Sequence, residues 1–132
     1  KTLEIINKML YDVVHHPNGT ANNVKSKYFG ISGKTGTAQI DYNTDNINYN
    51  SSFVGFFPSD KPKYSCIITI NKPNKKLGYY GSTVAGPVFK NIAEKIMSKY
   101  PNNLEFSLEE IERRLISNKI TSTHQWKNLK PY

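Results

Sequence analysis

SFVGFFPSDKPKYSCIITI, residues 52–70, is the stretch of sequence that decides the fold. It holds two apolar runs, at 52–57 and 63–70, with a turn between them that contains two prolines. Short apolar runs at this separation predict two strands joined as an antiparallel hairpin. Both faces of the second run are substantially apolar, so we expect that strand to be covered on both sides.

Helices are predicted on either side of this hairpin. Residues 2–16 carry apolar side chains at helical spacing, and Pro17 ends the pattern, so we expect a helix that packs on the core. A second helix follows Gly81-Ser82, with Pro87 in its first turn and a stop at Pro101. The apolar faces comprise Leu3, Ile6, Leu10 and Val13 in the first helix, and Phe89, Ile92, Ala93, Ile96 and Met97 in the second.

A third strand is predicted at Ile31–Ile40, after a polar loop at 20–30 and before a long surface loop at 41–51. The expected fold class is therefore α+β: a three-stranded antiparallel sheet flanked by helices, with the two terminal helices covering one face. Residues 1–100 form this domain. Residues 101–132 are expected to hold a short helix, whose capping box is Ser107 and Glu110, and then a tail or linker.

Composition excludes several protein classes. The 132 residues are 37% hydrophobic and 21% charged, which indicates one soluble globular domain rather than a disordered or coiled-coil chain. No apolar run approaches the roughly 20 residues that span a bilayer. A single cysteine, Cys66, excludes an internal disulfide and a cysteine-based zinc site.

The chain is basic, with 18 Lys+Arg against 10 Asp+Glu and a net charge of +8. Its lysines are dispersed, and no arginine precedes Arg113, although arginine is the usual bidentate partner of phosphates and guanine. The charge therefore indicates a solvated basic surface rather than a nucleic-acid-binding face.

Gly33-Lys34-Thr35-Gly36-Thr37 is the segment with the strongest chemical signal. It does not fit a phosphate-binding P-loop, because the required earlier glycine would fall on Tyr28. On a strand at the edge of a cleft, Lys34 would supply a fixed positive charge for an anionic substrate. Thr35 and Thr37 lie on the same side of a strand, so both hydroxyls could bind one carboxylate. Gly36 would leave room for a ligand, and the N–H of Thr37 could serve an oxyanion.

Four ordered segments carry a family resemblance. The first is Lys-Thr-Gly-Thr-Ala in ISGKTGTAQ, and the next two are Phe-Val-Gly-Phe-x-Pro and the apolar strand ending in Asn-Lys-Pro, both in SSFVGFFPSDKPKYSCIITINKP. The fourth is Tyr-Gly-x-x-Val-Ala-x-Pro-Val-Phe in YYGSTVAGPVFKNIAEKI. In this order and spacing, residues 1–100 resemble the C-terminal part of the transpeptidase domain of class B (monofunctional, division-type) penicillin-binding proteins. The resemblance implies a fragment of the β-lactamase/transpeptidase-like fold.

The resemblance also implies an activity, namely cross-linking of peptidoglycan. A serine attacks the D-Ala-D-Ala end of a stem peptide, releases D-Ala and passes the acyl group to a neighbouring stem's amine. β-Lactams would trap the same serine. Lys34, Thr35, Gly36 and Thr37 match the family's third motif: Lys34 tunes the serine network, Thr35 and Thr37 hold the terminal carboxylate, and the Thr37 N–H completes the oxyanion hole. No cofactor or metal is implied.

The sequence departs from the family pattern in one respect. No serine is followed by a lysine three positions later, and Ser-x-Asn is absent too. We therefore expect a fragment that is inactive alone and needs the missing N-terminal part of its domain. The resemblance further implies a periplasmic domain of a bacterial inner-membrane protein, anchored outside this fragment, with divisome or other cell-wall synthesis proteins as partners.

Alternatives remain open at this stage. A serine β-lactamase or a β-lactam sensor shares the Lys-Thr-Gly strand, and a small basic module for nucleic acid or anionic polymers would account for the charge. Cys66 is expected to be a core residue rather than a nucleophile. Tyr79 and Tyr80 could border a ligand groove or plug a turn.

Overall fold

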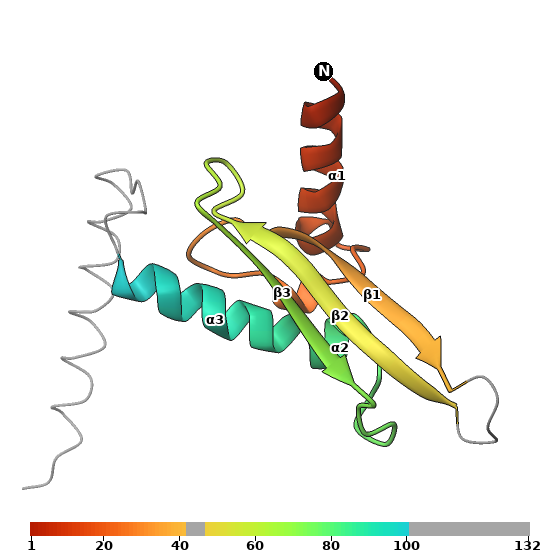
Figure 1. The fold of residues 1–132 in the computed structure, drawn as a ribbon. Helices are drawn as coiled ribbons and strands as arrows, with labels where there is room; N and C mark the ends of the chain where they lie inside the picture. Colours follow the sequence, from red (N-terminus) through yellow and green to blue (C-terminus); the bar gives the residue numbers. More distant parts are fainter. Residues whose placement is uncertain (42–46, 101–132) are drawn as a thin grey trace, which may run out of the picture. The chain divides into compact units, whose positions relative to one another are not determined.

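A computed structural model describes residues 1–41 and 47–100, which form one sheet with helices around it (Figure 1). The elements in chain order are α1 (Thr2–His15), the 3-10 helix η1 (Asn22–Val24), β1 (Ser32–Ile40), β2 (Asn48–Phe57), β3 (Tyr64–Asn71), α2 (Gly81–Val84) and α3 (Gly86–Lys99). The predicted order of helix, three strands and helix is confirmed, and the short helix α2 is an addition to it.

The three strands form an antiparallel sheet in the order β1-β2-β3. β2 begins at Asn48, which pairs with Ile40 at the end of β1. The prediction of a surface loop as far as Ser51 was therefore wrong. Residues 48–51 belong to a strand because their backbone groups pair with β1. Their polar side chains give no sign of this pairing in the sequence.

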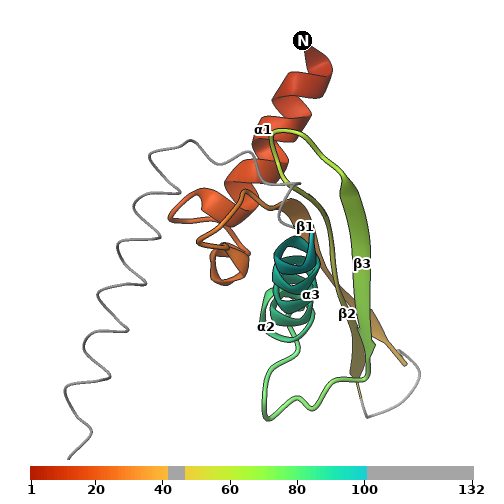
Figure 2. The ribbon, with the colours of Figure 1, turned by 90° about the vertical axis from the view of Figure 1, so that its left-hand side faces the viewer.

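One face of the sheet is covered by α3, as Figure 2 shows. Phe53 and Phe57 of β2 meet Phe89 of α3 edge to face, with ring centroids 4.8 and 5.8 Å apart. All three side chains are fully buried. Buried aromatic rings contribute large apolar areas and favour such edge contacts, so this cluster is the centre of the core.

The opposite face of the sheet is open within the described part of the chain. Val54 of β2 is 47% exposed and Ile67 of β3 is 64% exposed. These two residues are opposite each other in the β2–β3 register. Along β3, exposed and half-buried residues alternate. The prediction that β3 is covered on both sides is thus wrong for the described residues, because α3 covers only one side.

Helix α1 also differs from its prediction. Only Val14 is buried in it, whereas Leu3, Ile6 and Met9 are exposed. The helix contacts β1 and η1, and its N-terminal half extends away from the sheet (Figure 1). Only the last turns of α1 reach the sheet. The predictions that this helix packs on the core along its length and covers the sheet face beside α3 are therefore wrong.

No helix among residues 1–41 and 47–100 is long and apolar enough to cross a membrane. The helix predicted near residues 104–118, with Ser107 and Glu110 at its start, lies outside the described residues, as does the tail after it. The division of the chain at residue 100 remains a prediction.

Candidate functional site

The four residues predicted to form the site, Lys34 to Thr37, lie in the middle of β1. β1 is an edge strand: β2 pairs with one side of it, and no other described strand pairs with the other. An edge strand presents unpaired backbone groups along its outer side. The predicted placement of this segment on an edge strand is thus seen in the structure.

The start of β1 is fixed by burial. Ser32 is 1% exposed, and its Oγ donates a hydrogen bond to the Oγ of Ser59 at 2.9 Å. Gly33 is buried as well, and a Cβ at that position would lie 2.7 Å from the Phe53 ring. The chain therefore enters the site from a rigid, closely packed position.

Lys34 is exposed, and its ammonium group turns back along the strand. Its Nζ donates to the carbonyl oxygen of Thr35 at 2.9 Å and to Thr35 Oγ1 at 3.3 Å. The positive charge and the first threonine hydroxyl are thus brought together at the strand edge. One anionic group bound here can contact both the Lys34 ammonium and the Thr35 hydroxyl.

Thr35 and Thr37 are opposite Phe53 and Ser51 in the β1–β2 register. Alternation along the strand places both threonines on one side, as predicted. Thr37 Oγ1 accepts a hydrogen bond from the backbone N–H of Gly81 at 3.1 Å. Because this contact uses the oxygen as an acceptor, the Thr37 proton is left to donate elsewhere.

Two glycines allow close packing beside this strand, and Gly81 lets α2 begin directly against it. A Cβ on Gly36 would lie 2.6 Å from Ser52 Oγ, and one on Gly81 would lie 2.7 Å from the Gly36 carbonyl oxygen. Gly36 therefore makes room for a neighbouring side chain, in addition to its predicted role of leaving space for a ligand. Gly81 was not among the predicted site residues, although it lies in a segment that carries the family resemblance and at the start of a predicted helix.

An aromatic cluster stands beside Thr37. Tyr79 stacks on Tyr49 with ring centroids 4.2 Å apart, and the Tyr80 ring lies tilted against it with centroids 4.5 Å apart. The hydroxyl groups of Tyr79 and Tyr80 share a hydrogen bond at 3.2 Å, and this contact raises the pKa of Tyr80. Ser51 Oγ donates to the Tyr79 carbonyl oxygen. Tyr79 thus plugs the turn, whereas Tyr80 remains 56% exposed next to the strand.

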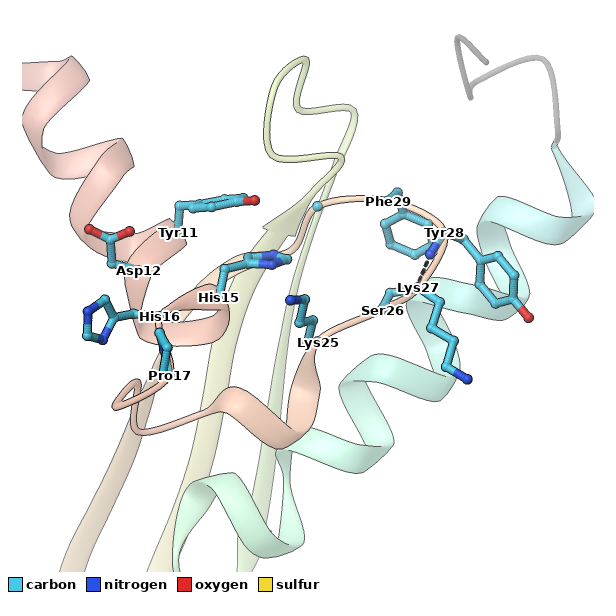
Figure 3. A pocket seen from close by; sticks show the side chains of 11 residues that line it. Tyr11, Asp12, His15, His16, Pro17, Lys25, Ser26, Lys27, Tyr28 and Phe29 are labelled. Atoms are coloured by element: carbon cyan, nitrogen blue, oxygen red, sulfur yellow. Dashed lines mark hydrogen bonds between the residues drawn. The ribbon is translucent and has the colours of Figure 1, made fainter. Parts of the chain in front are cut away.

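Other candidate positions lie elsewhere. An open pocket of about 580 Å³ lies between the end of α1 and residues 25–30 (Figure 3), and none of Lys34 to Thr37 lines it. Cys66 is a half-buried strand residue. Within the described ranges, no three His, Cys, Asp or Glu side chains are grouped as a metal site would require.

Comparison with known proteins extends these observations. Residues 1–94 match the family model "Penicillin binding protein transpeptidase domain". The chain is 35% identical over 99 residues to the peptidoglycan D,D-transpeptidase FtsI of Buchnera aphidicola subsp. Baizongia pistaciae, a match that covers 74% of this chain and 17% of that protein.

Two solved structures are similar in fold. One is the apo transpeptidase domain of Burkholderia pseudomallei penicillin-binding protein 3, with a TM-score of 0.60 and 30% identity over 71% of this chain and 28% of that one. The other is a complex of penicillin-binding protein PBP2 with MreC from Helicobacter pylori, with a TM-score of 0.59 and 26% identity over 75% and 18%. This chain spans a minor part of each of these proteins.

Proposed function

We propose that this chain, which belongs to the penicillin-binding protein transpeptidase family, supplies the substrate-binding wall of a peptidoglycan D,D-transpeptidase. The complete enzyme would bind a stem peptide that ends in D-Ala-D-Ala, form an acyl-serine and transfer the acyl group to a neighbouring stem's amine. β-Lactams would acylate the same serine. The observation that carries this proposal is the edge strand on which Lys34, Thr35 and Thr37 are brought together.

Each site residue has a distinct role in the proposal. The Lys34 ammonium, placed at the Thr35 hydroxyl, attracts the substrate carboxylate and polarises the network around the nucleophile. Thr35 and Thr37 hold the carboxylate through their hydroxyl protons. Gly36 keeps the strand narrow at this point, and the N–H of Thr37 stabilises the oxyanion of the tetrahedral intermediate.

The nucleophile would come from elsewhere in a longer protein, because no serine of this chain has a lysine three positions later. The apolar residues exposed on α1 and on the open sheet face, Met9 and Ile67 among them, support such a completing part. We place the complete enzyme in the periplasm, held by a membrane anchor outside this chain. Other cell-wall synthesis proteins would be its partners, because one similar structure is a complex with MreC.

A labelling experiment with fluorescent penicillin tests the proposal in the full-length protein. Lys34→Ala should slow covalent labelling by about a hundredfold or more, which is typical when one preorganised electrostatic contact is lost. Lys76→Ala is the matched control, because Lys76 is an exposed lysine in the turn that follows β3. It should label at the rate of the unmodified protein.

The expected result for this 132-residue chain alone is no covalent adduct, measured by mass spectrometry after incubation with a β-lactam. A stoichiometric adduct would show that the chain holds its own nucleophile. Equal labelling rates for Lys34→Ala and the unmodified full-length protein would remove Lys34 from the mechanism. The comparisons give no support to a β-lactamase, a sensor or a nucleic-acid-binding module.

A further inference from the structure

One histidine links the end of α1 to the start of β1 by a hydrogen bond. The backbone N–H of Ile31 donates a hydrogen bond to Nε2 of His15, at 3.3 Å. Ile31 is fully buried and is the residue directly before β1. The His15 ring also stacks on Tyr11, with the centroids 4.0 Å apart and the planes 11° from parallel. This one side chain therefore joins α1 to the strand that carries Lys34.

Only the neutral imidazole can make this hydrogen bond. A neutral histidine has one nitrogen that accepts and one that donates, whereas both nitrogens of the protonated ring are donors. Protonation of His15 would place an N–H against the Ile31 N–H and leave a buried backbone donor without its acceptor. An unsatisfied buried donor is unfavourable, so the protonated state must loosen this contact.

The surroundings of His15 also favour its neutral form. Burial, which is the largest cause, and the nearby Lys25 ammonium lower the pKa of His15 from its ordinary value of 6.5, against the smaller opposing effects of the Ile31 backbone and of Asp12. Figure 3 shows the Lys25 amino group beside the His15 ring, at the pocket that separates α1 from residues 25–30. The titratable and charged side chains around this pocket are Tyr11, Asp12 and His16 from α1 and its end, and Lys25, Lys27 and Tyr28 from the loop.

We propose that neutral His15 is a pH-dependent clasp, which holds the end of α1 to the start of β1 and opens when the ring takes up a proton. In the unfolded chain His15 takes up a proton more readily than in the folded chain. The contribution of the clasp to stability is therefore fully present above about pH 6.5 and is lost as the pH falls through the lower pKa of the folded protein. This inference is independent of the proposed transpeptidase activity.

Hydrogen exchange in the full-length protein tests the clasp directly. After correction for the intrinsic exchange rate, the segment that contains Ile31 should exchange about fivefold faster near pH 4.5 than near pH 8, which corresponds to the loss of one hydrogen bond. His15→Gln keeps an acceptor that does not titrate, so in this variant the protection of the Ile31 amide from exchange should not change with pH. His15→Phe keeps an aromatic ring but no acceptor, so in this variant the protection of the Ile31 amide should be low at both pH values.

The adjacent histidine provides the matched control. His16 is exposed, and its Nδ1 accepts a hydrogen bond from the nearby N–H of Asn18. His16→Gln should therefore keep the pH dependence of the unmodified protein. An NMR titration of the His15 ring, which requires no variant, should give a midpoint below 6.5. A midpoint above that value, or protection near Ile31 that is independent of pH in the unmodified protein, would overturn the proposal.

Discussion

The two halves of β1 are held in different ways. At its start, Ile31 is fully buried and Ser32 is 1% exposed, and both are hydrogen-bonded to other elements. In its second half, Thr37 and Ala38 are exposed, and Thr37 is held by a hydrogen bond from Gly81. Burial fixes one half of the strand, whereas polar contacts at the edge position the other.

This difference shows how one strand can be firmly held and still expose the side chains of the candidate site. A group that binds substrate must be accessible, so its own burial cannot stabilise it. A functional side chain is best held on a regular element, by neighbours whose own positions are fixed. The buried start of β1 supplies the fixed element, and Gly81 supplies the neighbour. The contrast predicts that substitutions should have smaller effects on stability from the start of the strand toward its end.

The largest effect is expected at the buried start. Ile31→Ala should lower the free energy of unfolding by about 2–5 kcal/mol, because it removes a fully buried side chain and leaves a cavity. Ile40→Ala is the matched control at the other end of the strand, where the side chain is only half-buried. Chemical denaturation followed by circular dichroism measures both. Equal losses for the two variants would show that burial does not distinguish the two ends.

Gly81→Ala should have an intermediate effect on stability and a selective effect on the site. The added Cβ would collide with the Ser52 carbonyl oxygen and would lie 2.7 Å from that of Gly36. Overpacking of this kind costs about 1–3 kcal/mol. Because the displaced N–H is the donor to Thr37, the rate of acylation by penicillin in the full-length protein should fall as well.

Ser82→Ala is the control for this substitution, because it changes the next residue without adding a group at the strand. Its stability should stay within about 0.5 kcal/mol of the unmodified protein, with an unchanged acylation rate. If Gly81→Ala folds normally and is acylated at the normal rate, then the Gly81 contact does not position Thr37.

Much of this fold could be predicted from sequence because its signals are local. The helical spacing in 2–16, the two apolar runs in 52–70 and Pro87 at a helix start each predict an element that the structure contains. The strand residues 48–51 could not be predicted, because they are polar and pair with β1 only through backbone contacts formed in the folded chain. The exposure of Leu3 could not be predicted either. An amphipathic pattern shows which face of a helix is apolar, but it does not show which part of the protein covers that face.

The site was predicted only in part, for a related reason. Lys34, Thr35, Gly36 and Thr37 are consecutive, so their spacing and alternation can be derived from the sequence. Gly81 lies 44 residues beyond Thr37, and only the folded chain brings its N–H to the Thr37 hydroxyl. The contact of His15 with Ile31 could not be predicted either, because it depends on how the chain returns after α1.

The smallest effects are expected beyond the end of β1, at Asp41. The side-chain amide of Asn48 donates to Asp41 Oδ2 at 2.8 Å, and the Lys72 ammonium lies 2.9 Å from the same oxygen. These two contacts, with the Asn48 hydrogen bond the larger, hold the pKa of Asp41 below its ordinary value of 3.8. We therefore expect both Asn48→Ala and Lys72→Ala to raise the pKa of Asp41, and the exposed control Lys75→Ala to leave it unchanged.

The sign of the pH effect follows from that lowered pKa. The folded chain gives up the Asp41 proton more readily than the unfolded chain, so the stabilisation is present above about pH 3.8 and is lost as the pH falls through the lower folded pKa. NMR titration of the Asp41 carboxylate measures the shift in each variant. A rise in Lys72→Ala with no change in Asn48→Ala would mean that the Asn48 hydrogen bond does not hold this end and that Lys72 alone does. The stabilisation at the far end of β1 would then weaken as the ionic strength rises, unlike that at its buried start.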